Sequence, residues 1–259
     1  PFARSRFSEK TLEQAAAIFC WGEHDSGELK KIFPGFKNIF VNAGSTRADL
    51  WLERFAQFWG APENAPSRPY VLFSSNFGLV NNYQRFWELI RGQRNSGYFE
   101  RVPELEKKFN VRFSEQTLLL YEVVKALQFL AASRPDIDVV IRPHPVEDPE
   151  SWKALLNPSE NIHVIRSGSI TPWVNNAAAV VQNGCTTALE ATVAGKPLIT
   201  FMPFVQTYDY DVPNSLGIKA VTPEELLKAV ESILENDPKN DDLMRGGMEI
   251  VAKKINFQG

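Results

Sequence analysis

The chain has 259 residues, of which 44% are hydrophobic and 23% charged, and its net charge at pH 7 is −3. This composition is typical of a globular protein with one large or two small domains, and the slightly acidic balance argues against broad electrostatic binding of nucleic acid. No apolar run is long enough to span a bilayer, and no secretory signal peptide is recognisable.

The first 60 residues alternate short apolar runs with longer amphipathic ones, which is the pattern of βα units around a parallel sheet. Strands are expected at Ala16–Cys20 and Asn38–Val41, and helices from Ser26 to Phe33 and from Thr46 or Asp49 to about Trp59. Three prolines within residues 61–69 then predict a linker. We therefore divide the chain into an N-terminal α/β domain, residues 1–66, and a C-terminal α/β domain, residues 67–259.

The second domain is expected to begin with a strand at Tyr70–Ser74. Apolar residues at helical spacing predict a helix from Glu115 to Ala132, whereas residues 81–111 show no clear period and are expected to form an excursion. From Asp138 onward the alternation is regular. Strands are expected at Val139–Ile141, Ile162–Ile165, Ala179–Val181 and Leu198–Phe201, and helices near Pro149–Leu156, Pro172–Asn176, Thr187–Ala194, Pro223–Leu234 and Asp241–Lys254.

The cysteines and histidines carry little sign of metal chemistry. Cys20 and Cys185 lie far apart in apolar segments, which predicts buried thiols in a reducing compartment instead of a disulfide. With three histidines and two isolated cysteines in the whole chain, we expect no metal site.

The most informative motif is Arg142-Pro143-His144-Pro145, which directly follows the apolar run 138–141. Ligands of open α/β sheets bind at the carboxyl ends of the strands, and the two prolines hold the imidazole in a fixed direction. An imidazole beside a permanently charged guanidinium suits a phosphate-bearing ligand. The alternatives are a loop histidine without a role, and an Arg142 that pairs with Glu147 or Asp148.

A second motif spans residues 182–191, where a predicted strand is followed by a helix. Gly184 allows a tight turn after Asn183, and Thr186 and Thr187 supply hydroxyls at the first turn of the helix. Free N–H groups at a helix start favour an anion, so these residues are candidate phosphate ligands. The alternative is a helix cap without a ligand, because Thr187 and Glu190 have the spacing of a capping box.

A third motif, Ser167-Gly168-Ser169, follows the strand expected at Ile162–Ile165. Main-chain groups of this loop could contact a base and line a nucleotide pocket, while Trp173 is better explained by helix packing. The three motifs all lie at carboxyl ends of strands in one βα series, so we expect them on the same rim of the sheet.

The first motif and residues 183–191 of the second, together with Pro172-Trp173 and Gly195-Lys196-Pro197, resemble the C-terminal half of GT-B-type bacterial surface-polysaccharide glycosyltransferases. Residues 21–23, 44–50 and 73–78 resemble the same group, which is similar to Kdo and nonulosonate transferases that use CMP-sugars. The resemblance implies an α/β, GT-B-like fold, with a Rossmann-type parallel sheet in the C-terminal domain and a partial, acceptor-side N-terminal domain. It departs from the family at Ser45-Thr46, where Asn-Pro is more typical before the arginine.

The resemblance also implies roles for the donor-side residues. His144 would protonate, or donate a hydrogen bond to, the departing nucleotide phosphate, where a fixed donor lowers the barrier because charge builds on the leaving oxygen. Thr186 and Thr187 would grip the same phosphate, with Arg142 as a further contact. Glu190 would hold the ribose hydroxyls, with the capping box as its alternative.

On the acceptor side the resemblance gives no clear residue. Asp25 or Glu23 could deprotonate an acceptor hydroxyl, and the alternative is favourable acid placement at the start of a helix. Some related Kdo transferases use an aspartate nucleophile. The position where that aspartate is first sought holds Asn76 in this chain, and an amide cannot act as that nucleophile.

The resulting hypothesis is a glycosyltransferase that moves a sugar, Kdo or another nonulosonate from a CMP-sugar, onto a bacterial surface polysaccharide or lipopolysaccharide. It needs no cofactor beyond this donor, and its acceptor is a glycan or glycolipid. We expect it in the cytoplasm at the inner face of the bacterial membrane, with peripheral association through residues before Pro1. The rivals are a nucleotide-sugar epimerase, a CDP-glycerol glycerophosphotransferase, and a non-catalytic nucleotide-binding module.

Overall fold

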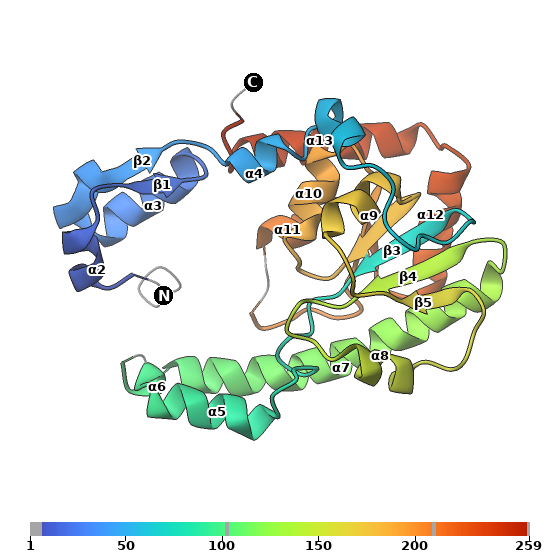
Figure 1. The fold of residues 1–259 in the computed structure, drawn as a ribbon, viewed down its shortest axis with the longest axis horizontal. Helices are drawn as coiled ribbons and strands as arrows, with labels where there is room; N and C mark the ends of the chain where they lie inside the picture. Colours follow the sequence, from blue (N-terminus) through green and yellow to red (C-terminus); the bar gives the residue numbers. More distant parts are fainter. Residues whose placement is uncertain (1–6, 102–103, 209–210, 258–259) are drawn as a thin grey trace.

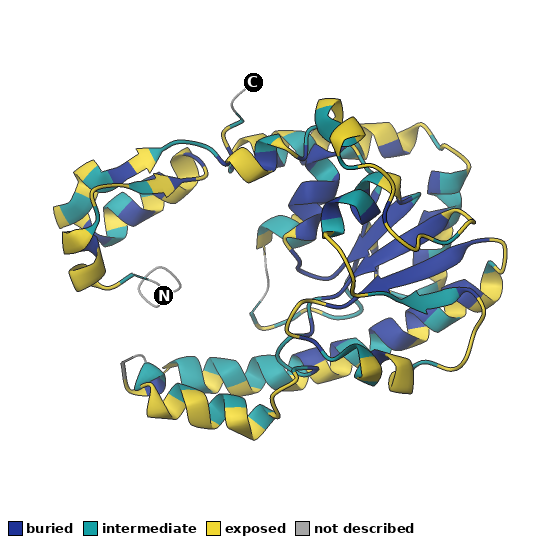
Figure 2. Ribbon diagram, in the orientation of Figure 1, coloured by how far each residue is buried: buried dark blue, intermediate teal, exposed yellow. Residues whose placement is uncertain are grey.

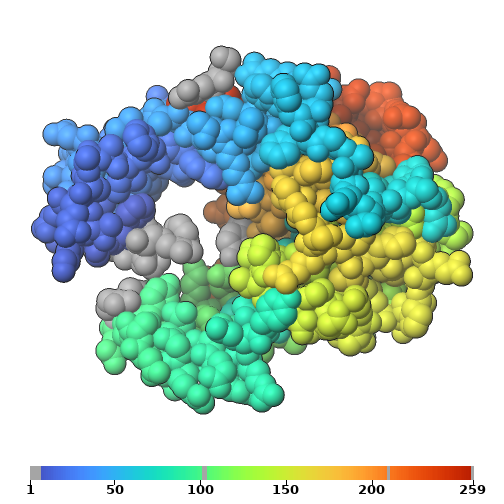
Figure 3. Space-filling model, in the orientation of Figure 1, coloured from blue at the N-terminus to red at the C-terminus, as the bar shows by residue number. Residues whose placement is uncertain are grey.

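The computed structural model describes residues 7–101, 104–208 and 211–257, which form two α/β parts of unequal size and a projecting helical arm (Figure 1). Figure 3 shows that the N-terminal part (blue) and the arm (green) stand apart across an open hollow. Among the described residues, no helix is both long and apolar enough to cross a lipid bilayer.

The N-terminal part is built on two short parallel strands, β1 (Ile18–Cys20) and β2 (Phe40–Asn42), in which Ile18 pairs with Phe40. Both expected strands are therefore present. Each begins two residues later than expected, β1 ends at the expected residue and β2 ends one residue later. Three helices pack on this pair: α2 (Glu9–Gln14), α3 (Glu23–Ile32) and a 3-10 helix at Pro34–Ile39. The part has its own small apolar core, made of Leu12, Cys20, Leu29, Phe33 and Phe40.

The larger part contains a six-stranded sheet in the order β5-β4-β3-β6-β7-β8, in which all neighbouring strands are parallel. The strands are β3 (Tyr70–Ser74), β4 (Asp138–Arg142), β5 (Ile162–Val164), β6 (Ala179–Gln182), β7 (Leu198–Phe201) and β8 (Ile218–Ala220). Every residue of the inner strands β3, β4, β6 and β7 is buried (Figure 2). This explains their continuous apolar runs, because helices cover both faces of the sheet.

One face of the sheet is covered by α7 (Glu104–Ser133), α8 (Pro149–Leu155) and α12 (Pro223–Leu234), whose apolar residues join one core with Val71, Phe73 and Ile141. The opposite face is covered by α9 (Ile170–Asn176), α10 (Thr187–Val193) and α13 (Lys239–Ala252). The fold class expected from the sequence is confirmed, since the strands and helices alternate around a parallel sheet. Strand β8 and helices α2 and α11 (Asp211–Ser215) were not expected.

Residues 81–111, expected as an excursion, contain α5 (Phe86–Asn95), α6 (Tyr98–Arg101) and the first turns of α7. These elements form an arm that projects from the sheet (Figure 1). Phe86 stacks on Phe109 and lies 3.7 Å, between ring centroids, from Phe113. Helix α7 therefore begins eleven residues earlier than expected, because aromatic contacts across the arm extend it beyond the sheet.

The apolar cores divide the chain earlier than the proline-rich linker does. Helix α4 (Thr46–Asp49) and a 3-10 helix at Glu53–Phe58 replace the single helix expected here, and Ala48 and Trp51 belong to the core of the large part. The C-terminal end then returns to the N-terminal part, where the N–H of Asn256 donates to the carbonyl of Trp21 at 2.8 Å.

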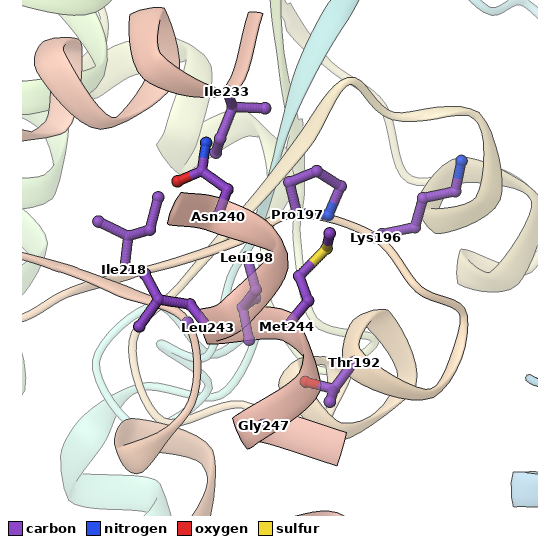
Figure 4. Close-up of a pocket in the computed structure, with 11 residues that line it drawn as sticks. Thr192, Lys196, Pro197, Leu198, Ile218, Ile233, Asn240, Leu243, Met244 and Gly247 are labelled. Carbon is purple, nitrogen blue, oxygen red and sulfur yellow. The ribbon is translucent and has the colours of Figure 1, made fainter. Parts of the chain in front are cut away.

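Helix α13 packs over α10 and the first residues of β7 and β8, and it leaves a cavity of only about 20 Å³ (Figure 4). Leu198, Ile218, Leu243 and Met244 are among its lining residues. A space of this size holds no more than a single water, so it is a packing gap.

Two glycines near this helix should respond oppositely to alanine. No atom lies within 4 Å of a Cβ built on Gly246, in the exposed middle of α13, so Gly246→Ala should raise the free energy of unfolding by about 0.5–1 kcal/mol through helix propensity. Gly217 has φ +70°, and its Cβ would lie 2.3 Å from the carbonyl oxygen of Leu198. Gly217→Ala should therefore lower the unfolding free energy by more than about 2 kcal/mol, as measured by urea denaturation.

Candidate active site

A cavity of about 790 Å³ lies where the carboxyl ends of β3, β4, β5 and β6 meet. The strand register explains this position, because Ser74 at the end of β3 pairs with Arg142 at the end of β4. The cavity is lined by Arg47, Ser74, Ser75, Arg142, Pro143, His144, Pro145, Arg166, Ser167, Gly168, Ser169, Ile170, Cys185, Thr186 and Thr187. The three sequence motifs therefore share one cavity on one rim, as expected.

His144 is exposed on the turn that follows β4, and its ring orientation is set by the backbone. The N–H of Val146 donates to His144 Nδ1 at 3.3 Å, and the N–H of Glu147 donates to the His144 carbonyl at 2.8 Å. Because Nδ1 accepts a hydrogen bond, the neutral ring carries its proton on Nε2. The histidine can thus offer an Nε2–H donor to a ligand in the cavity.

The completely buried carboxylate of Glu147 holds this turn against the loop after β3. It accepts hydrogen bonds from Ser75 Oγ at 2.7 Å, from the N–H of Phe77 at 2.8 Å and from Trp152 Nε1 at 2.8 Å. In the sequence analysis Glu147 appears only as an alternative partner of Arg142. That pairing is wrong, because Arg142 binds backbone carbonyls and Glu147 binds Ser75, Phe77 and Trp152. A glutamate five residues before the tryptophan of a helix gives no signal in the sequence that could reveal this network.

Arg142 is 94% buried and faces inward, with its guanidinium 5.2 Å from the centroid of the Trp173 ring. Nη1 donates to the carbonyls of Ile165 and Ser167, and Nη2 donates to that of Gly168. Burial lowers the pKa of this guanidinium to about 10. Arg142 therefore fixes the 167–169 loop, and its buried Nε has no hydrogen-bond partner among the described residues.

Trp173 is a packing residue, as expected. Its side chain is buried between Arg142 and Tyr70, and the Tyr70 hydroxyl donates to its carbonyl at 2.8 Å. No face of this ring is left for a ligand base to stack on.

The loop after β6 is braced by Gln182, whose Oε1 accepts the N–H groups of Gly184 and Cys185 at 2.6 and 2.9 Å. Gly184 has φ +91°, and its carbonyl accepts Asn76 Nδ2 at 2.8 Å. Asn76 thus ties the loop after β3 to the loop after β6. Asn183 and Gly184 were expected as ligand contacts, but neither lines the cavity. The N–H of Gly184 is already occupied.

Thr186 and Thr187 line the cavity at the start of α10. Thr187 is the first helical residue, and its Oγ1 accepts from Ser74 Oγ at 2.9 Å, so it can donate its own proton to a ligand. The capping box expected for Thr187 and Glu190 does not form, because Thr186 occupies the cap position and makes no side-chain cap bond. Ser169, by contrast, caps α9 through its hydroxyl.

Glu190 lies one turn into α10 and is 98% buried beneath the cavity. Burial raises the pKa of this carboxyl, and a hydrogen bond from Thr171 and the charge of Arg47 act in the opposite direction. Its Oε1 has no hydrogen-bond partner among the described residues. Glu190 does not line the cavity, so its expected contact with a ribose stays a prediction.

The site-residue prediction missed two cationic side chains that line the cavity, Arg47 and Arg166. Arg47 follows the Ser45 cap of α4 and lies 5.5 Å from the Trp51 ring, measured from its Cζ. Arg166 donates to the Tyr83 hydroxyl and to the Pro145 carbonyl, both at 2.7 Å. Arg47 stands in the quoted 44–50 motif, and Arg166 directly follows an expected strand, so both could have been chosen from the sequence.

The proposed acceptor-side acids lie elsewhere. Glu23 and Asp25 belong to α3 in the N-terminal part, where Asp25 and His24 line a separate cavity of about 530 Å³. Burial raises the pKa of Asp25, and the charges of His24 and Lys254 oppose this shift. Glu23 lines neither cavity, so the structure does not bring either carboxylate together with His144.

Cys20 and Cys185 are both buried free thiols, as expected. In the part of the chain that the structure describes, no group of three or more histidine, cysteine, aspartate or glutamate side chains is arranged to hold a metal ion.

No family model and no curated protein matches this sequence. Solved structures do. A wall teichoic acid polymerase, TagF, solved with CDPG, superposes with a TM-score of 0.55 at 10% identity, covering 95% of this chain and 55% of its own. A UDP-N-acetylglucosamine 2-epimerase superposes with a TM-score of 0.54 at 12% sequence identity, over 96% of this chain and 60% of its own. The UDP-GlcNAc 2-epimerase of Neisseria meningitidis, bound to UDP-GlcNAc, superposes with a TM-score of 0.50 at 14% sequence identity, over 90% of this chain and 56% of its own.

The chain has a GT-B-type fold. The likeness runs over nearly all of this chain, and the parallel sheet with helices on both faces matches these structures. The chain spans only 55–60% of the length of these three structures. At 10–14% identity the likeness defines the fold alone, so an activity has to be argued from the residues of the site.

The network around Glu147 predicts a large loss of stability on its removal. Glu147→Ala leaves the donors of Ser75, Phe77 and Trp152 without an acceptor, so the free energy of unfolding should fall by about 3 kcal/mol in chemical denaturation. Glu249→Ala, at an exposed position of α13, is the control and should change it by less than about 0.5 kcal/mol. Equal effects of the two substitutions would show that the network contributes nothing.

Proposed function

We propose that this chain is the donor-binding part of a GT-B glycosyltransferase that takes a sugar from a nucleotide-linked donor. One observation carries the proposal: His144, Arg47, Arg142, Arg166 and the hydroxyls of two threonines line a single cavity at the carboxyl rim. Among the residues that the structure describes, no aspartate or glutamate lines it. Such a lining suits the phosphate of an activated donor.

In the proposed reaction, an acceptor hydroxyl attacks the anomeric carbon, and the bond from that carbon to the phosphate oxygen breaks. His144 donates its Nε2 proton, as a hydrogen bond or by transfer, to the departing phosphate. Thr186 and Thr187 donate hydroxyl hydrogen bonds to the same phosphate. The acceptor hydroxyl loses its proton to a base, for which Asp25 and Glu23 of the N-terminal part are our candidates.

The donor and its remaining contacts extend the proposal. We infer a CMP-linked Kdo or related nonulosonate as donor and a bacterial surface polysaccharide or lipopolysaccharide as acceptor, on the basis of the sequence motifs. Ser167, Gly168 and Ser169 would contact the nucleotide through the loop that Arg142 fixes, and Glu190 the ribose. The reaction would occur in the cytoplasm, at the inner face of the bacterial membrane.

A CDP-glycerol glycerophosphotransferase is the second candidate. The cavity carries three guanidinium groups, which favours a ligand with more charge than one phosphate, such as a diphosphate. A glycerophosphotransferase would require CDP-glycerol, and an epimerase would interconvert its donor without any acceptor. A non-catalytic module would bind nucleotide and release nothing from it.

The first test is a screen of nucleotides by thermal shift, since a ligand that binds only the folded state raises the melting temperature. We expect CMP to stabilise the protein, and Thr187→Ala to reduce this stabilisation by removing a hydroxyl donor to the phosphate. A preference for UDP, or the absence of stabilisation by any nucleotide, would contradict the CMP-linked donor.

The second test addresses the histidine. His144→Ala should lower the rate of sugar transfer by about 10²–10⁴-fold and leave the melting temperature unchanged, because the side chain is exposed and acts on the leaving group. His163→Ala is the matched control, because that histidine lies on the outer strand β5, bonds to Asp138 of β4 and does not line the cavity. Transfer by His144→Ala at the parent rate would refute the catalytic role.

A further inference from the structure

The exposed guanidinium of Arg166 is held in place although it lies at the edge of the cavity. Nη1 donates to the Tyr83 hydroxyl and Nη2 to the Pro145 carbonyl, each at 2.7 Å, and Cζ lies 5.2 Å from the centroid of the Tyr83 ring. An exposed arginine ordinarily keeps its rotamer freedom, and fixing it costs entropy. Here three contacts from two other segments fix its position before any ligand binds.

The partners of Arg166 are neutral, so they leave its positive charge uncompensated. A phenol and a peptide carbonyl satisfy two of its nitrogens, and no carboxylate of the described part of the chain lines this cavity. This distinguishes it from Arg91 and Arg94 on the nearby arm, which form ion pairs with Glu88 and Glu106. A guanidinium fixed by neutral partners is prepared to bind an anion that comes from outside the chain.

The strand order places Arg166 on the opposite side of His144 from the two threonines. Arg166 follows β5 and contacts the turn after β4. Thr186 and Thr187 follow β6, and β3 lies between β4 and β6 in the sheet. Thr187 Oγ1 reaches Ser74 at the end of β3, so the threonines lie closer to the turn after β4 than the strand order alone implies. Arg166 lies on the far side of that turn, bonded to the Pro145 carbonyl, where a second anionic group of the same ligand can contact it.

We propose that Arg166, positioned by Tyr83, forms a second anion subsite, so that the ligand of this cavity carries two anionic groups on either side of His144. One is the phosphate at Thr186 and Thr187, and the other is a second phosphate or a carboxylate on the transferred group. The inference rests on the proposed function, because it assumes that the threonines hold a nucleotide phosphate.

Calorimetric titration of the whole chain with three probes tests the subsite: CMP, with one phosphate; CDP, with two; and CMP-N-acetylneuraminate, with one phosphate and a carboxylate. One of the two-anion ligands should bind about tenfold or more tightly than CMP, and which of them does so identifies the second group. UMP and UDP form a parallel pair that separates the effect of the base from that of the charge.

Substitutions assign this gain to one side chain. Arg166→Gln should abolish the tenfold gain and change CMP affinity by less than about twofold, and Arg166→Lys should restore part of it. Tyr83→Phe keeps the ring but loses the hydroxyl, and should reduce the gain without affecting CMP. Arg91→Gln, an exposed arginine of α5 outside the cavity, is the matched control and should behave like the parent.

The outcomes separate this inference from the proposed function. If nucleotides bind but none of the three ligands with two anionic groups binds more tightly than its monophosphate, the second subsite is refuted and the donor site stands. If Arg166→Gln weakens CMP and the two-anion ligand equally, or weakens neither, Arg166 is no separate subsite. Absence of binding by all five nucleotides would refute the proposed function and this inference together.

Discussion

The buried carboxylate of Glu147 is the interaction on which the candidate site depends. It joins the turn after β4 to the loop after β3 and to helix α8 by accepting from Ser75, Phe77 and Trp152. A carboxylate without contact with water is tolerated only when its lone pairs are satisfied, and here the donors come from three segments. The same turn carries His144, so the direction of the imidazole follows from the packing of Glu147 beneath it.

The other loops of the rim are braced in the same manner, each by a side chain that ends in the backbone of a neighbouring loop. Arg142 binds the carbonyls of the 167–169 loop, Gln182 binds the N–H groups after β6, and Asn76 binds the carbonyl of Gly184. The polar groups of Gln182 and Asn76, and most of those of Arg142, are hydrogen-bonded within the protein. The imidazole, the threonine hydroxyls and the exposed arginines Arg47 and Arg166 are left to contact a ligand directly, and Arg142 adds its charge. A cavity whose walls are fixed by such bonds requires little rearrangement on binding.

The two α/β parts are joined by more than the covalent chain. The end of the chain returns to the N-terminal part, where a Cβ on Gly22 would lie 2.3 Å from the carbonyl oxygen of Lys254, and one on Gly44 would lie 2.4 Å from that of Asn256. Only glycine allows backbones to approach so closely. Gly44 lies two residues before helix α4, which brings Arg47 to the cavity, so the C-terminal segment helps to position a residue from the other end of the chain.

The sequence by itself determined the parallel α/β architecture, nearly every strand of the large sheet and the rim on which the motifs meet. It could do so because buried parallel strands are continuous apolar runs, and their carboxyl ends are marked by prolines, glycines and hydroxyl residues. The early start of α7 was decided by aromatic contacts between Phe86 and residues more than twenty positions away.

Only the tertiary structure decided what each polar residue of the rim contacts. We predicted from the sequence that Arg142 contacts the ligand, and in the structure its guanidinium binds backbone carbonyls of the protein. Glu147 was considered only as a partner of Arg142, but it accepts hydrogen bonds that hold the His144 turn in place. Arg166 was not predicted as a site residue, yet it lines the cavity. The physical reason is that a side chain's partners depend on contacts across loops 20–110 residues apart, such as Asn76 with Gly184. No local pattern of residues records those contacts.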